Sequence, residues 1–505
     1  MLYRFSPALF VLLPEVLLTI TGVLIMLAEP MIAPSKSRRA LGWLAIVGAV
    51  ASGLAAYDQL RVQNAINSIV GFGGTIQVDV FSTFFHMLIA AIVVVTLLAS
   101  IRYFDKAPVS HAGEYFALVC FGAVGMMLMT SATELLLVFI GLEISSISTY
   151  ILAGFRKGRA TASEASLKYF LLGSFATAFF LYGIALAYGA TGSTKLAAIG
   201  STLSATDTPK LALLAIAMMI VGLAFKVSAA PFHVWTADVY QGAPSPVVGL
   251  MSTAPKAAVF AVLLRVLFST ALPLRPHWLL LIEILAVCSM TVGNLAALMQ
   301  RDVKRMLAYS SIATAGYILV AYAGDPLHAS SGVMIYTAAY AAMNVGAFVV
   351  LSALNGYDET LRTREDFSGL ATKHPMLAAL LAFFLVSLIG IPFTAGFTGK
   401  FSTFYAAGSY GAVVLIVLAV INSGFACFYY LRLALALYTK PENEILNTPE
   451  TQAPAGACIG VPAALALAAT ALATLLLGIL PNALLHHTER AQPTPLPVVA
   501  TLASR

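Results

Sequence analysis

The chain has 505 residues, of which 60% are hydrophobic and only 10% are charged, and its mean hydropathy is +0.90. Soluble globular chains carry about 25% charged residues, so this composition excludes the soluble class and indicates a polytopic membrane protein. The net charge of +6 does not indicate nucleic-acid binding, because the basic residues lie in short loops between apolar runs.

The apolar runs are long enough to form membrane helices, which need about 20 residues each. The sequence lacks the alternating polarity over about 10 residues that is typical of outer-membrane barrel strands. It therefore predicts an all-α polytopic membrane protein with about 14 transmembrane helices. The predicted spans are 8–28, 40–57, 80–101, 114–130, 133–154, 166–189, 210–238, 245–269, 277–298, 303–323, 330–354, 375–407, 410–438 and 458–480.

Two of these segments, 210–238 and 375–407, are too long for one straight span, and both contain a proline beside small residues. The prolines are Pro231 and Pro392. Proline removes a backbone donor and kinks a helix, and such breaks persist in membranes only where protein or a polar cavity satisfies the freed groups. Two broken helices five segments apart predict two inverted five-helix repeats, a plan typical of transporters.

The repeats define the predicted organisation of the chain. An N-terminal three-helix segment (1–110) precedes the first repeat (111–270), and the second repeat (271–440) precedes a C-terminal helix and tail (441–505). Alternate loops are rich in lysine and arginine, and such loops are typically cytoplasmic. With an even number of spans, this pattern predicts that both termini are periplasmic.

Four ionisable residues lie deep inside apolar segments, namely Glu143, Lys226, Lys256 and Lys400. Each costs roughly 2.5–3.5 kcal/mol or more at the centre of a lipid-facing helix. Glu143 and Lys256 lie on the order of 15 Å from either end of their segments, which is farther than a side chain reaches by snorkelling. An interfacial anchor does not explain such positions, so we expect a buried functional role. Lys400 lies nearer the end of its segment.

Lysines combined with a carboxylate suit stepwise proton transfer. A lysine in a low-dielectric site, or beside another cation, releases its proton more easily than in water. A nearby carboxylate has the opposite effect, so a glutamate that approaches or leaves a lysine can switch its proton affinity. The pattern therefore predicts proton movement along the buried lysines.

Several polar neighbours are weaker candidates for the same pathway. His233 follows the break at Pro231 and is a possible proton relay at neutral pH, but its ring can equally bond carbonyls freed by the break. Asp238 and Tyr240 are candidates for an entrance, with capping and loop roles as alternatives. The hydroxyl residues within 145–149 either hold water beside the buried glutamate or pack between helices, which is the common role of small residues.

No cofactor is predicted in this chain. The sequence contains no metal-ligand cluster, no nucleotide-binding glycine pattern and no Ser-His-Asp arrangement. The four cysteines are far apart, in or beside apolar segments, so core packing is the expected role.

Four stretches resemble the antiporter-like membrane subunits of respiratory complex I, and among these the chain is most similar to subunit N of bacterial NADH–quinone oxidoreductase, the counterpart of mitochondrial NADH dehydrogenase subunit 2. The resemblance covers most of the chain and implies 14 transmembrane helices with inverted five-helix repeats. The stretches are GLEISSISTYILAGF (141–155), GLAFKVSAAPFHVWTADVYQGAPSPV (222–247), QRDVKRMLAYSSIATAGY (300–317) and GIPFTAGFTGKF (390–401).

The resemblance also implies roles for the buried charges. Glu143 matches a glutamate that pairs with the lysine of the broken helix, which Lys226 matches. Lys256 matches the connecting lysine and Lys400 the terminal lysine of a hydrated midplane axis. This sequence departs from the pattern at Thr314, where many relatives have histidine, so a relay there requires water in place of the ring.

By the same resemblance, the partners are the other membrane and peripheral subunits of complex I and the lipid bilayer of a bacterial inner membrane, with no nucleic acid. NADH, flavin, iron–sulfur clusters and quinone are expected in partner subunits. Two alternatives remain open from the sequence. One is a subunit of a multi-subunit cation/proton antiporter, and the other is a structural scaffold whose charges hold helices in register.

Overall fold

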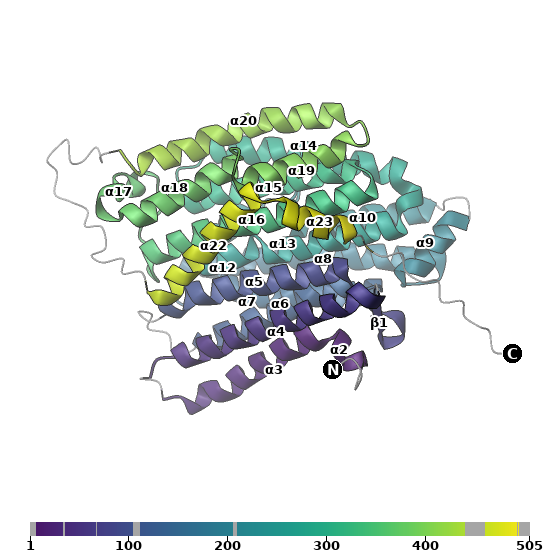
Figure 1. Ribbon diagram of the computed structural model, residues 1–505, viewed down its shortest axis with the longest axis horizontal. Coiled ribbons are helices and arrows are strands. Elements are labelled where there is room, and N and C mark those ends of the chain that lie inside the picture. Colours follow the sequence, from purple (N-terminus) through teal and green to yellow (C-terminus); the bar gives the residue numbers. More distant parts are fainter. Residues whose placement is uncertain are drawn as a thin grey trace.

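The computed structural model describes residues 7–33, 36–66, 68–104, 112–205, 210–439, 460–491 and 493. These residues form a bundle whose helices lie side by side (Figure 1). Twelve helices within the described ranges are long and apolar enough to cross a membrane. The predicted all-helical membrane fold is therefore confirmed.

The helices and strands follow one another in three groups. The first group is α2 (Pro7–Val11), α3 (Leu13–Ala28), η1 (Glu29–Met31), α4 (Arg39–Ile66), β1 (Ser68–Gly71), η2 (Phe72–Gly74), β2 (Ile76–Asp79), α5 (Val80–Tyr103), α6 (Ala112–Ser131), α7 (Leu135–Ala153), α8 (Ala160–Thr191) and α9 (Leu196–Ala205). The second group is α10 (Lys210–Lys226), α11 (Thr236–Gly242), α12 (Ser245–Met251), α13 (Ala254–Leu264), η3 (Arg265–Thr270), η4 (Leu272–Leu274), α14 (Arg275–Met299), α15 (Val303–Val320), η5 (Ala321–Ala323) and α16 (Pro326–Asn355). The third group is η6 (Glu365–Phe367), α17 (Leu370–Lys373), α18 (Pro375–Ile389), α19 (Ala395–Gly408), α20 (Val413–Ala436), α22 (Val461–Ile479) and α23 (Asn482–Arg490).

Both predicted breaks are present. The segment predicted at 210–238 consists of α10 and α11, with Pro231 between them, and the segment predicted at 375–407 consists of α18 and α19, with Pro392 between them. Neither segment is among the twelve helices that are long and apolar enough to cross a membrane in the described chain. The count of fourteen and the inverted relation of the two repeats stay predictions.

A short antiparallel hairpin, β1 and β2, stands in the polar connection before α5, where no strand was expected. Its side chains Ile69 and Val78 pack on Phe10 of α2 in a small separate core. Asp79, the last residue of β2, caps α5 by accepting a hydrogen bond from Ser82 N at 2.8 Å. The hairpin, α2 and α9 gather at one end of the helices, the hairpin end, and α17 lies at the opposite end (Figure 1).

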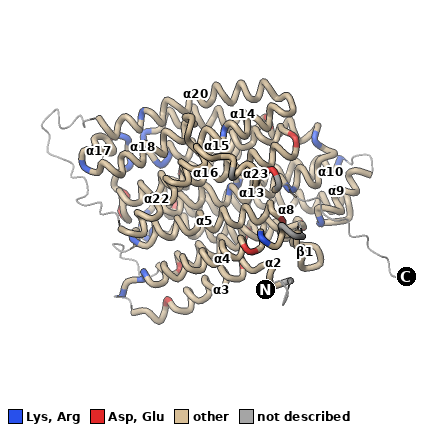
Figure 2. The backbone as a smooth tube through the Cα atoms, viewed as in Figure 1, with Lys and Arg blue, Asp and Glu red and all other residues tan. Residues whose placement is uncertain are grey.

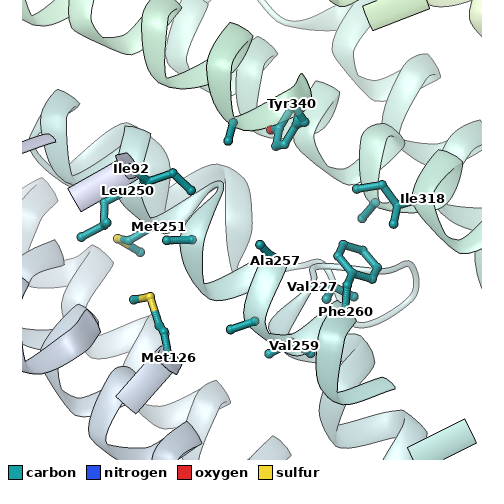
Figure 3. Close-up of a cluster of buried hydrophobic side chains, with 14 of the residues drawn as sticks. Ile92, Met126, Val227, Leu250, Met251, Ala257, Val259, Phe260, Ile318 and Tyr340 are labelled. Atoms are coloured by element: carbon teal, nitrogen blue, oxygen red, sulfur yellow. The ribbon is translucent and has the colours of Figure 1, made fainter. Parts of the chain in front are cut away.

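The core lies along α12, α13, η3, α15 and α16. The span Ser245–Thr270 is 100% buried, whereas only 28% of the C-terminal span α22 is buried. Figure 3 shows the packing around α12 and α13: Met126 contributes from α6 on one side, and Ile318 and Tyr340 lie on α15 and α16 on the other. Among the described spans, only Ser245–Thr270, which carries Lys256, is wholly buried.

Candidate functional site

Lys226 is the last residue of α10, at the first break, and is only 6% exposed. Its Nζ donates hydrogen bonds to Ser146 Oγ at 2.6 Å and to Tyr150 Oη at 3.0 Å, both on α7. The Nζ also lies 4.8 Å from the ring centroid of Tyr150 and 5.6 Å from that of Tyr169. Hydroxyls and ring faces stabilise the ammonium without neutralising its charge. Ser146 therefore binds the lysine in addition to packing between helices.

Glu143 lies on α7 one turn before Ser146. Its Oε1 is buried and has no hydrogen-bond partner among the described residues. The carboxylate is near enough to act electrostatically on Lys226, but no ion pair within 4.0 Å joins these two described side chains. The direct pairing that the resemblance implies is therefore absent from this conformation.

The freed backbone groups of the first break are satisfied by two residues that the sequence did not single out. Trp235 Nε1 donates to Phe225 O at 3.2 Å, and Ala230 N donates to Ser289 Oγ at 2.8 Å. His233 is half-buried, and its Nδ1 makes no hydrogen bond within the described part of the chain. The indole of Trp235 therefore caps the Phe225 carbonyl near the end of α10, whereas His233 interacts with the backbone of Pro231 inside the break.

Changing Trp235 to phenylalanine is expected to destabilise this break by about 1–3 kcal/mol, because the buried carbonyl of Phe225 loses its donor. The ring stacks on Tyr169 at 4.4 Å, and phenylalanine keeps part of this contact. The measurement is the temperature at which the subunit loses protease resistance in the purified complex. Trp43→Phe, on an exposed position of α4, is the matched control. Equal melting temperatures for both variants would contradict the capping role.

Lys256 lies near the start of α13 and is 3% exposed. Its Nζ donates to Ser311 Oγ on α15 at 2.7 Å. The same lysine lines a cavity of about 10 Å³, together with Thr314, Thr337 and Tyr340. A polar cavity of that size holds about one water molecule, and the Tyr340 hydroxyl has no partner among the described residues. Thr314, the position at which this sequence departs from the family pattern, therefore lines a space that suits a single water molecule.

Lys400 lies on α19 after the second break and is 6% exposed. Its Nζ donates to Ile389 O at 2.7 Å and to Ser423 Oγ at 2.7 Å, and lies 4.8 Å from the ring centroid of Tyr317. Ile389 is the last residue of α18. Gly390 follows at φ +94°, and a Cβ there would lie 3.1 Å from Lys400 Cδ, so glycine suits both the backbone and the close lysine. The lysine thus satisfies a carbonyl that the break frees.

One face of α15 joins the surroundings of the last two lysines. Ser311, Thr314 and Tyr317 follow at intervals of three residues and so share a side of the helix. Ser311 binds Lys256, Thr314 lines the cavity beside it, and the Tyr317 ring lies against Lys400. One side of the helix therefore carries Ser311 and Thr314 beside Lys256 and the ring of Tyr317 beside Lys400.

The possible entrance residues have different surroundings. Asp238, on α11, binds Lys168 and Arg305 at 2.6 Å each and is about one-third exposed. Tyr240, two residues later, is fully buried, and its hydroxyl has no hydrogen-bond partner in the described chain. Its ring packs against Trp235, with the centroids 6.3 Å apart. Asp238 therefore belongs to a surface ion-pair group, and Tyr240 lies deeper in the protein.

Buried ion pairs elsewhere were not foreseen. Glu359, in the connection after α16, contacts Arg156 at 2.9 Å and Lys304 at 3.0 Å. A second pair joins Arg265 to Asp79 at 2.7 Å near the hairpin. Burial opposes ionisation of Glu359, but the charges of Lys304 and Arg156 outweigh it and lower the pKa of this carboxyl. The basic residues of both groups looked like ordinary loop or helix-end charges, so the sequence carried no signal for them.

Comparisons with known proteins identify the family of the chain. The family model described as NADH:quinone oxidoreductase/Mrp antiporter, TM, matches residues 132–426. The chain is 49% identical over 479 residues to NADH-quinone oxidoreductase subunit N 2 of Koribacter versatilis, covering 94% of this chain and 95% of that protein. It is 41% identical over 483 residues to subunit N of Trichlorobacter lovleyi, covering 95% and 96% of the two chains.

Solved structures give the same result. A chain of respiratory complex I from Thermus thermophilus with bound aureothin superposes with a TM-score of 0.77 at 36% identity, covering 94% of this chain and 98% of that one. A chain of the Mrp complex from Dietzia sp. superposes with a TM-score of 0.82 at 20% identity, covering 96% of each chain, a likeness that shows the fold alone. The extent and identity of these matches establish that the chain belongs to the NADH-quinone oxidoreductase subunit N family.

Proposed function

We propose that this chain is a proton-translocating membrane subunit of NADH–quinone oxidoreductase and that its protons move along Lys226, Lys256 and Lys400. Glu143 acts on the first of these lysines as an electrostatic switch. Quinone reduction in other subunits drives the movement, and NADH, flavin, iron–sulfur clusters and quinone belong to those partners. The chain itself carries out no redox chemistry.

The observation that supports this proposal most directly is the kind of partner that each buried cation has. Within the described residues, the three central lysines make hydrogen bonds only to hydroxyl or carbonyl oxygens. In contrast, the buried cations Arg156 and Arg265 contact carboxylates. A cation that only held helices in register would be paired, because an unpaired buried charge is costly. Unpaired lysines can lose a proton and thereby remove that cost.

The proposed order of the proton-transfer steps follows the positions of the residues in the bundle. A proton that enters beside Asp238 meets Tyr240 before it reaches the first break. Lys226 receives it there, and separation of Glu143 from Lys226 favours its release toward Lys256. From Lys256, the hydroxyl face of α15 and the small polar cavity lead to Lys400. His233 lies beside this row, at the outer edge of the break, and is a secondary relay in the proposal.

The proposal includes the topology predicted from the sequence. The two broken segments belong to inverted repeats at 111–270 and 271–440, which follow the three-helix segment 1–110 and precede 441–505. Many lysine and arginine positions gather at the end of the bundle where α17 lies (Figure 2). We assign that end to the cytoplasm of a bacterial inner membrane and both termini to the periplasm. The remaining surface contacts lipid and the other subunits of the complex.

The experiment that tests the proposal replaces Lys226 by methionine in the purified complex reconstituted into vesicles. Methionine keeps the length of the side chain but carries no proton. We expect coupled proton translocation to fall about 100-fold, which is the usual effect of losing a proton-transfer group. Lys210→Met is the matched control, because that lysine stands at the exposed start of α10, away from the proposed row.

The result also separates proton transfer from scaffolding. Proton transfer predicts that the Lys226 variant assembles with all subunits and fails in translocation. Scaffolding predicts that assembly fails first, and that any assembled complex pumps normally. A fully assembled Lys226→Met complex with the original number of protons per NADH would refute the proposed row.

A further inference from the structure

A second group of buried titratable side chains lies outside the lysine row, at the hairpin end of the bundle. Glu15, in the first turn of α3, is 4% exposed, and His86, on α5, is 0% exposed. Glu15 Oε1 lies 3.6 Å from His86 Nε2. Two titratable groups therefore meet inside a membrane-spanning region.

The hydrogen bonds of this pair are incomplete. His86 Nε2 lies 3.1 Å from Met127 O on α6, so that nitrogen carries a proton. His86 Nδ1 and both carboxylate oxygens of Glu15 have no hydrogen-bond partner among the residues that the structure describes. A carboxylate without a donor is unfavourable in a buried site, whereas a protonated carboxyl or a neighbouring imidazolium removes that cost. The pair is therefore arranged to hold one proton.

Further buried polar groups lie on α4, α5 and β2. Gln63 on α4 donates to Thr83 Oγ1 at 2.7 Å, and Thr83 lies one turn before His86 on α5. The other amide atom of Gln63, and both amide atoms of Gln77 in β2, are buried without a partner in the described chain. Unsatisfied buried polar groups are the usual binding sites of internal water. They extend the polar surroundings of His86 toward the hairpin.

The same group connects with the helix that carries Lys256. That helix continues from α13 into η3, which begins with Arg265, nine residues after the lysine. Arg265 binds Asp79 at 2.7 Å and Thr130 O at 2.9 Å, and both charges act electrostatically on His86. Asp79 and Arg265 neutralise one another as an ion pair. The exchangeable proton in this group is therefore the one that the Glu15–His86 pair holds. From α6 the Met127 carbonyl contacts His86, and from α4 the Gln63 amide contacts Thr83.

We propose that Glu15 and His86 form a proton-holding site on the route between the lysine row and the hairpin end of the membrane. This inference rests on the proposed function. The site takes up one proton on Glu15 or on His86 Nδ1, and releases it toward Gln63 and Gln77. No bond other than that to the proton changes.

The test uses the whole complex with Glu15→Gln and His86→Gln. Glutamine at 86 keeps an N–H donor for Met127 O but takes up no proton. We expect either variant to assemble and to lower coupled proton translocation about tenfold or more. Glu365→Gln is the control, because this glutamate is exposed, lies in the short helix η6 and pairs with Arg364 at 2.8 Å.

A spectroscopic readout tests the site without relying on translocation. Infrared difference spectra of the complex across a pH step are expected to contain a carboxyl C=O band that disappears in Glu15→Gln and shifts in His86→Gln. Failure of Lys226→Met to affect pumping would count against the lysine row alone, because the infrared band still reports the pair. Unchanged infrared spectra and unchanged pumping in both variants would overturn the proton-holding site.

Discussion

Replacement of Lys256 by methionine is expected to lower coupled proton translocation at least about 100-fold, with NADH oxidation falling in parallel if coupling stays tight. The reason is its position. Lys256 is the least exposed of the three lysines, and it binds Ser311 on the helix whose hydroxyl face leads to Lys400. Methionine fills the same volume in a wholly buried span, so packing changes little. The measurement is the initial rate of acidification in vesicles that contain the purified complex.

Two further variants sharpen this result. Thr314→Val removes one hydroxyl from the cavity beside Lys256 and is expected to have a smaller effect in the same direction. Lys210→Met, at the exposed start of α10, is the control and is expected to leave the rate unchanged. If Lys256→Met pumped as fast as Lys210→Met in an equally assembled complex, Lys256 would have no place in the pathway.

The largest effect on stability is expected for Glu359→Gln. The change leaves Arg156 and Lys304 buried against a neutral amide, and loss of one partner from a buried ion group costs about 3–5 kcal/mol. Ser245 also loses part of its interaction, because its backbone N–H and its Oγ both donate to Glu359 Oε1 at 2.7 Å. The measurement is the temperature at which the subunit becomes sensitive to protease in the purified complex.

A neighbouring residue provides the control variant, and the pH dependence of stability provides a second test. Asp358 pairs with Arg159 at 2.9 Å, but its side chain is 77% exposed, so Asp358→Asn is expected to change little. The pKa of Glu359 lies below its ordinary value of 4.5, so its stabilisation is complete above that pH and is lost as the pH falls through the lowered pKa. Glu359→Gln should lack this acid-dependent loss. A variant that kept the original melting temperature at neutral pH would contradict the ion-group assignment.

The features that the sequence predicted correctly are those that depend on local composition. Pro231 and Pro392 stand in apolar runs too long for one straight span, and the structure breaks both runs there. The depth of Lys256 was inferred by counting residues along its segment, and its side chain is buried. Each inference needed only the rise of a helix and the cost of a charge in hydrocarbon.

The features that the sequence missed depend on contacts between distant segments. Arg156 and Lys304 looked like topological charges of loops, and only folding brings Glu359 to them. Trp235 had no role predicted from the sequence, and its bond to Phe225 O follows from the shape of the break. The strands of the hairpin are only four residues each, too short for a recognisable alternation.

The Glu359 ion group has a consequence for biogenesis. Arg156 leaves the ribosome about 200 residues before Glu359, which corresponds to roughly 10–40 s of translation at about 5–20 residues per second. During that interval, the cation that closes the end of α7 has no carboxylate of this group to bind. The first half of the chain therefore inserts before the ion group at this end of α7 can form. The group forms only after the connection that follows α16 has been synthesised. Nascent chains that stop before Glu359 should consequently be better substrates for membrane quality-control proteases than chains that stop shortly after it.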